Sequence, residues 1–263
     1  MYNVFINFSK TLGSGMFEVK SSAITYTGYE YQTLHGVKLL ASWLNSPTRY
    51  KRIGFEVDDS EDCIPQGIDD IVCERQNLKR DYIQVKFTPN TDNNLLSWEW
   101  LLKKSGKTER SRTLLQKFSD AIDDISIENT ENVILLTNKI PERDVECALN
   151  DNKIIYDLIP IETQDKIVVQ LGSEEKARLL FSVLDVHHSD LSYKTLSIDI
   201  EESLRKLTDE AGVHRLINKS RDWSKFKNQP TEGGWITLED IRGVISTKRP
   251  EPIPQSFIIP EHG

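Results

Sequence analysis

The chain has 263 residues, enough for one large domain or for one domain with a small appendage. Its composition, 38% hydrophobic and 28% charged, is typical of globular proteins that bury a core, and no apolar run approaches the length of a membrane-spanning helix. The formal net charge of −8 disfavours a general nucleic-acid binder, whose affinity comes from neutralising phosphates. Cys63, Cys73 and Cys147 lack metal-ligand spacing, and the sequence shows no secretory leader, so we expect a reducing, cytoplasmic location.

The first part of the chain alternates strand and helix patterns. Two short strands are predicted at residues 2–7 and 16–20. Apolar residues at helical spacing predict a helix over residues 27–45, which a Ser-Pro pair ends. A strand over residues 52–57 follows, and then an acidic loop over residues 58–66.

Two further strands are predicted at residues 67–73 and 81–87, with a turn near residues 76–79 between them. Strand side chains alternate, so Gln84 and Lys86 share one face of the second strand while its apolar residues share the other. One face can therefore bury in a core while the other presents a polar pair beside the acidic residues of the neighbouring strand.

This polar pair, with two aspartates, forms the candidate site of the sequence. Carboxylate and amide oxygens from Asp69, Asp70 and Gln84 would suit Mg²⁺ or Mn²⁺. Lys86 could orient a water molecule or offset charge on a phosphate oxygen. Together these groups are the minimum equipment for metal-assisted phosphodiester hydrolysis. Alternation does not separate Asp69 from Asp70, because either choice gives the strand a mixed face.

A basic segment lies within the next helical pattern, which runs from residue 98 to about residue 125 with an interruption at residues 105–106. It is broken only by Glu109, and it is either a solvated surface or a contact for backbone phosphates beside the site. Its members are Lys103, Lys104, Lys107, Arg110, Arg112 and Lys117.

The remainder of the chain reads as a covered strand at residues 132–137 followed by a mainly helical portion. Helices are predicted at residues 174–183, 198–211 and 237–245. The adjacent His187 and His188 are interpreted as structural or surface residues.

The motifs, taken in order, resemble a known family. Asp69 followed by Gln84-Val85-Lys86 resembles the PD-(D/E)XK nuclease core, in the variant with Gln before x-Lys. The helix start Gly28-Tyr29-Glu30-Tyr31-Gln32 is similar to that of Mrr-like restriction nucleases. Over roughly residues 24–140 the set most resembles the dsDNA-endonuclease domain of bacterial anti-phage effectors.

This resemblance implies roles for the site residues. The Gly-Ile-Asp match favours Asp69 as the metal ligand, and Glu56 is a candidate second ligand. Gln84 would complete the coordination through its amide oxygen, and Lys86 would position the attacking water. Gln32 stands where the family has an acid, so we expect it to orient a ligand rather than to bind the metal itself.

The fold implied by the resemblance is an α/β, restriction-endonuclease-like core, with a mixed central sheet flanked by helices. We expect a nuclease core over residues 1–141, a helical portion over residues 142–247, and a proline-rich linker over residues 248–263 toward a sensor or NTPase domain. The implied function is Mg²⁺-dependent cleavage of double-stranded DNA with low sequence specificity, activated by homo-oligomerisation and without a membrane partner. The alternatives are a catalytically inactive nuclease fold that serves DNA binding or oligomerisation, and a helical interaction module in residues 142–247.

Overall fold

The computed structural model describes residues 21–57, 64–89, 94–106, 108, 110–225 and 234–246. Several sequence predictions lie outside these residues: the strands at 2–7 and 16–20, most of the acidic loop, Lys107, and the proline-rich tail.

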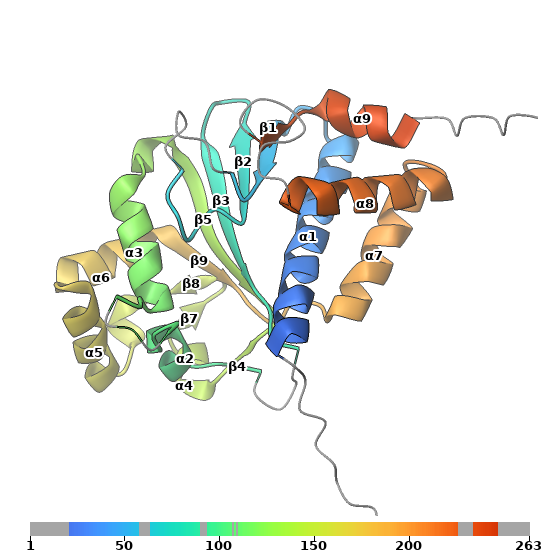
Figure 1. Cartoon of the computed structure of the whole chain (residues 1–263). Coiled ribbons are helices and arrows are strands. Elements are labelled where there is room, and N and C mark those ends of the chain that lie inside the picture. The colour runs from blue at the N-terminus through green and yellow to red at the C-terminus, as the bar shows by residue number, and fades with distance from the viewer. Residues whose placement is uncertain are drawn as a thin grey trace, which may run out of the picture.

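Eight of the described strands form one mixed sheet, in the order β10-β1-β2-β3-β5-β9-β8-β7 (Figure 1). Their bounds are β1 (Tyr50–Phe55), β2 (Ile71–Arg75), β3 (Arg80–Lys86), β5 (Thr130–Thr137), β7 (Leu149–Asn150), β8 (Lys153–Ile154), β9 (Leu184–His187) and β10 (Trp235–Ile236). A separate parallel pair is formed by β4 (Leu95–Leu96) and β6 (Ile140–Pro141).

Strand direction brings several chain segments to one edge of the sheet. The neighbours β3, β5 and β9 are parallel, so their carboxyl ends lie together. Because β2 is antiparallel to both β1 and β3, its amino end and the carboxyl end of β1 lie at this same edge. We call it the carboxyl edge of β3.

Helices cover both faces of the sheet (Figure 1). One face carries α1 (Ser21–Asn45), α7 (Tyr193–Arg205), α8 (Glu210–Lys225) and α9 (Leu238–Ser246). The other carries α2 (Trp98–Leu102), α3 (Leu114–Asp124), α5 (Ile161–Leu171) and α6 (Glu174–Val183). The short α4 (Arg143–Glu146) and the 3-10 turns η2 (Ile127–Asn129) and η3 (Tyr156–Leu158) lie in connections. The prediction of a mixed sheet flanked by helices is therefore confirmed.

Each face of the sheet has its own hydrophobic core, because alternate residues of β3 point to opposite sides. Ile83 and Val85 pack in the core beneath α1, whereas Tyr82 packs in the core beneath α3. The pattern of strand 81–87 predicts this division, and the structure adds that both faces are covered by helices.

The C-terminal portion is mainly helical, as predicted, but it also supplies strands to the central sheet. Residues 184–187 form the strand β9, which extends the central sheet, and β7, β8 and β10 also come from this portion. The predicted helix at 198–211 is two helices, α7 and α8, because Asp209 caps a new start: its Oδ1 accepts the Gly212 N–H at 2.7 Å. The helices α6 and α9 match their predictions to within one residue.

Three boundaries near the candidate site also differ from prediction. The strand predicted at 67–73 begins only at Ile71, because Gly67 has φ +98° and starts a turn. The strand predicted at 52–57 ends at Phe55, since Glu56 has φ +44°. The helical pattern at 98–125 forms two helices separated by residues 103–113.

Gly36 sets the close approach of α1 to β1, and we expect Gly36→Ala to destabilise the fold. A Cβ there would lie 2.5 and 2.6 Å from two ring carbons of Phe55, which is buried and has little room to move. Such overpacking costs about 1–3 kcal/mol. The matched control is Gly28→Ala in the same helix, where a Cβ meets nothing within 4 Å and removing glycine should stabilise by up to about 1 kcal/mol. Urea unfolding of both variants checks the sign, and equal midpoints would contradict this packing argument.

Candidate active site

The register of β2 and β3 places Asp70 against Gln84. Ile71 pairs with Ile83 in this antiparallel ladder, so Asp70, which precedes Ile71, lies opposite Gln84, which follows Ile83. Asp70 Oδ2 accepts hydrogen bonds from Gln84 Nε2 and from the Val85 backbone N–H, the latter at 2.8 Å. The carboxylate is thus fixed by the strand that carries the Gln-x-Lys motif.

Glu56 and Gln32 join this pair from two other elements. The ladder continues past β1, where the Glu56 N–H donates to the Asp70 carbonyl oxygen at 3.1 Å. Gln32 of α1 donates from Nε2 to Glu56 Oε1 at 3.3 Å and to the Asp70 carbonyl at 3.4 Å. The buried Gln32 side chain therefore orients the Glu56 carboxylate, a position that fits the orienting role expected for it.

Lys86 is the last residue of β3 and lies on the same face as Gln84. The pKa of Asp70 reflects its burial and the charges around it. The pKa of Asp70 is raised to about 6. Burial is the largest cause, the Lys86 charge and the Val85 N–H oppose it, and the charges of Asp69 and Glu56 add to it. Three carboxylates and one ammonium therefore act on one another at this edge, and burial is the main cause of the raised pKa of Asp70.

Asp69 has a different local task. Its Oδ1 accepts the Gly67 N–H at 2.9 Å, which closes the turn before β2. The structure consequently places Asp70, and not Asp69, in direct contact with Gln84. The sequence resemblance favours Asp69 as the metal ligand, and that assignment stays a prediction; of the two aspartates, Asp70 is the one hydrogen-bonded to Gln84.

Apart from Lys117, the described part of the basic segment lies in the connection between α2 and α3 rather than on a helix. Lys103, Lys104, Arg110 and Arg112 are exposed, and Arg112 pairs with Asp120 at 3.4 Å. Lys117, in α3, lies against the turn at Gly67. This segment therefore leads into the helix that borders the candidate site.

Long-range contacts at the carboxyl edge of β3 could not be predicted from local sequence patterns. Asn138 exchanges two hydrogen bonds of 2.9 Å with the Thr88 backbone, which holds the chain just after Lys86. Glu30, beside Gln32 in the sequence, turns away to Arg221 of α8 at 2.9 Å. Only the folded chain brings together residues that are 50 or 191 positions apart.

The side chains at this edge offer a small number of oxygen ligands for a hard cation. Within the described ranges, no group of three or more His, Cys, Asp or Glu side chains is arranged to hold a metal ion. The site offers two carboxylates, Asp70 and Glu56, and the amide of Gln84. Mg²⁺ typically binds through one or two carboxylates, keeps several waters and gains substrate oxygens, so this smaller set suits it.

Comparison with protein-family models gave no match, and comparison with curated proteins gave none either. In the part of the chain that the structure describes, no helix has both the length and the apolar character needed to cross a membrane.

Proposed function

We propose that this chain is a metal-dependent DNA endonuclease domain that hydrolyses phosphodiester bonds. The observation that carries the proposal is the meeting of Asp70, Gln84, Lys86 and Glu56 at one edge of the sheet, in a cluster with excess negative charge. The pKa of the Asp70 carboxylate is raised by burial and by neighbouring carboxylates, so a bound cation would stabilise its ionised form.

Each residue has a role that follows from its place. Asp70 and Glu56 would hold Mg²⁺ or Mn²⁺, with the Gln84 amide oxygen as a neutral ligand. The metal, when bound, supplies Lewis-acid polarisation of the scissile phosphate. Lys86 orients a water and offsets the negative charge that develops on the phosphate oxygens. Gln32 holds Glu56 in place, and the exposed lysines and arginines between α2 and α3 contact the backbone of double-stranded DNA.

The second candidate is a nuclease fold without activity that binds DNA or assembles into oligomers. Gln84 favours it, because an amide brings one negative charge fewer than the usual carboxylate, and here its nitrogen is hydrogen-bonded to Asp70. The two candidates differ in whether the site binds a divalent cation and cuts DNA.

Incubation of the chain with supercoiled plasmid and Mg²⁺ tests the proposal. We expect nicked and linear products that disappear with EDTA. The assay should be repeated with the chain fused to an inducible dimeriser, because the family resemblance implies activation by assembly. DNA binding without cleavage in both states, with Mg²⁺ and with Mn²⁺, would favour the second candidate.

We also expect Asp70→Asn to stabilise the metal-free protein at pH 7.5. A carboxyl whose pKa is raised on folding binds more protons in the folded chain, so the free energy of unfolding falls as pH rises from about 4 to about 6. A shift to about 6 corresponds to a penalty on the order of 3 kcal/mol at neutral pH, which the uncharged isostere removes. Below about pH 4 both proteins carry a neutral group and should unfold alike.

Thermal unfolding with and without Mg²⁺ measures this effect. Mg²⁺ should stabilise the wild-type protein at pH 7.5, because the cation relieves the same charge penalty, and should do so far less for Asp70→Asn. Asp69→Asn is the matched control, since its amide oxygen can still accept the Gly67 N–H. If Mg²⁺ stabilised the wild-type protein and Asp70→Asn equally, Asp70 would not be a metal ligand.

A further inference from the structure

A second polar cluster lies in a pocket of about 400 Å³ between α1 and the sheet. Three histidines line it from separate parts of the chain: His35 from α1, His187 from the end of β9, and His188 from the connection after it. Lys38 and Asn152 add an ammonium and an amide. None of these residues belongs to the candidate active site.

The acidic residue of this pocket is engaged by neighbouring protein groups. Asp190 Oδ2 lies 2.9 Å from Nε2 of the buried His35 and accepts the Tyr31 hydroxyl at 3.1 Å. Burial alone would raise the pKa of Asp190, but the close approach of His35 Nε2 holds it below its usual value, with help from Leu191 N–H and Tyr31. The carboxylate therefore remains ionised and is bound to protein donors.

The other polar groups leave the pocket rich in donors. Lys38 makes one long pair with Asp199, at 3.5 Å, between two half-exposed side chains, and such pairs are weak. His188 contacts Ser189 through Nδ1. The ammonium of Lys38, the imidazoles of the two neighbouring histidines and the Asn152 amide can each donate a hydrogen bond into the pocket. Burial and the neighbouring His187 lower the pKa of His188, so its imidazole donates as a neutral group.

The sheet supplies apolar side chains to the lining of the pocket. They are Ile71, Ile83 and Leu136, from three adjacent strands. A donor-rich rim over an apolar floor, in a volume within the usual 300–1,000 Å³ of small-molecule sites, suits a ligand with two different ends.

We propose that this pocket binds a small organic anion, with its carboxylate or phosphate group held by Lys38, His187 and His188 and its apolar body against Ile71, Ile83 and Leu136. The site is distinct from the candidate active site. Ile71 and Ile83 neighbour Asp70 and Gln84 in the chain, and alternation sends those two side chains to the other face of the sheet.

Calorimetric titration of the whole chain with phenyl phosphate and with benzoate, in EDTA, tests the proposal. EDTA removes metal, so binding through a metal in the candidate active site does not contribute. We expect one saturable site for at least one anion, with a Kd on the order of 1 mM or tighter for a ligand of this size. Benzyl alcohol, a neutral compound of similar shape, should bind at least about tenfold more weakly, because it lacks the acidic group.

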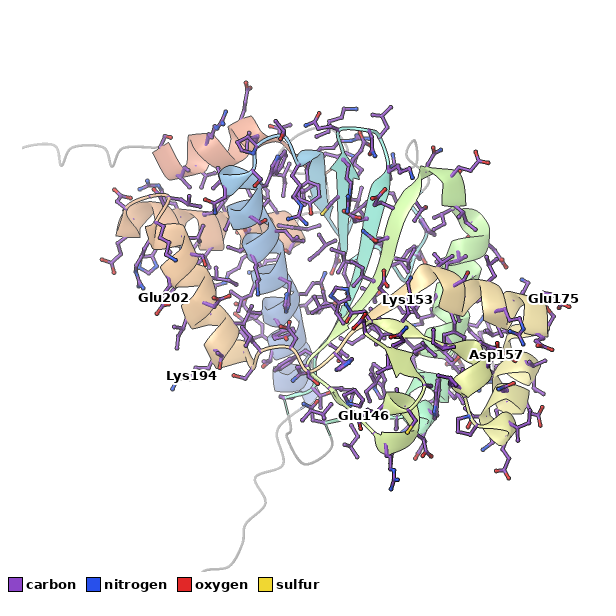
Figure 2. The ribbon with its side chains drawn as sticks, turned by 180° about the vertical axis from the view of Figure 1, so that it is seen from behind. Glu146, Lys153, Asp157, Glu175, Lys194 and Glu202 are labelled. Atoms are coloured by element: carbon purple, nitrogen blue, oxygen red, sulfur yellow. The ribbon has the colours of Figure 1, made fainter. Side chains whose placement is uncertain are left out.

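Two variants locate the site, and two controls test the assignment. Lys38→Ala and the double change His187→Ala with His188→Ala should each weaken anion binding by about tenfold or more. Lys194→Ala removes an exposed cation of α7, labelled in Figure 2 and outside the pocket, and should leave binding unchanged. Asp70→Asn should also leave it unchanged.

Three results would overturn the proposal. The first is no saturable binding of either anion up to roughly 10 mM, a range that reaches well above the expected Kd. The second is wild-type affinity in both pocket variants. The third is loss of binding in Asp70→Asn while the pocket variants retain it. Lys38 is exposed, so its variant keeps the test valid if the double histidine change impairs folding.

Discussion

Lys86→Ala should lower the DNA cleavage rate by about 10²-fold or more while the protein remains folded. Lys86 ends β3 on the face of Gln84, and its charge acts directly on the Asp70 carboxylate. Losing the ammonium removes the group that offsets charge on the phosphate oxygens in the transition state. Plasmid cleavage at saturating Mg²⁺ measures the effect, and circular dichroism verifies the fold.

Two companion variants separate the role of Lys86 from a general loss of positive charge. Lys79→Ala removes a half-exposed lysine from the turn at the opposite end of β3 and should cut DNA at the wild-type rate. Lys86→Arg keeps the charge but changes its geometry, so we expect an intermediate rate. Wild-type cleavage by folded Lys86→Ala would refute the assignment, and an equal loss in Lys79→Ala would reduce it to an effect of net charge.

Local patterns in the sequence predicted the parts of the fold that depend on local physics. The alternation in residues 81–87 identified both faces of β3, and helical spacing placed α6 without error in its bounds. The mixed sheet with helices on its faces was implied by the family resemblance, and the same periodicities are compatible with it. The strand β9 was not predicted, because it spans only four residues, too few to distinguish strand alternation from a helical pattern.

The candidate site was predicted as a set of residues but not as an arrangement. Periodicity left Asp69 and Asp70 equivalent, because their difference depends on a turn with a positive φ at Gly67 and on the register of β2 against β3. The Val85 N–H bond to Asp70 and the Asn138 contact with Thr88 depend on pairings that no local pattern encodes. The pocket beneath α1 was missed for a similar reason, since its three histidines converge only in the folded chain.

Asp70→Asn should abolish Mg²⁺-dependent cleavage, whereas Asp69→Asn should cut DNA at close to the wild-type rate. The two substitutions are chemically identical and one residue apart, and the structure gives the two side chains different tasks. A metal ligand needs its negative charge, so loss of the Asp70 charge should cost about 10²-fold or more in rate. Asp69 serves as a hydrogen-bond acceptor for the Gly67 N–H, and an amide oxygen can do the same.

Alanine at each position completes the comparison. Asp69→Ala removes the acceptor that closes the turn, so it should lower stability by about 1 kcal/mol and reduce cleavage less than tenfold. Asp70→Ala should match Asp70→Asn in activity, because both lack the charge. Cleavage rates measured over a Mg²⁺ titration distinguish weaker metal binding from a slower reaction. If Asp69→Asn proved the inactive variant and Asp70→Asn the active one, the ligand would be the aspartate that the sequence resemblance favoured, and the arrangement of Asp70 against Gln84 would have another purpose.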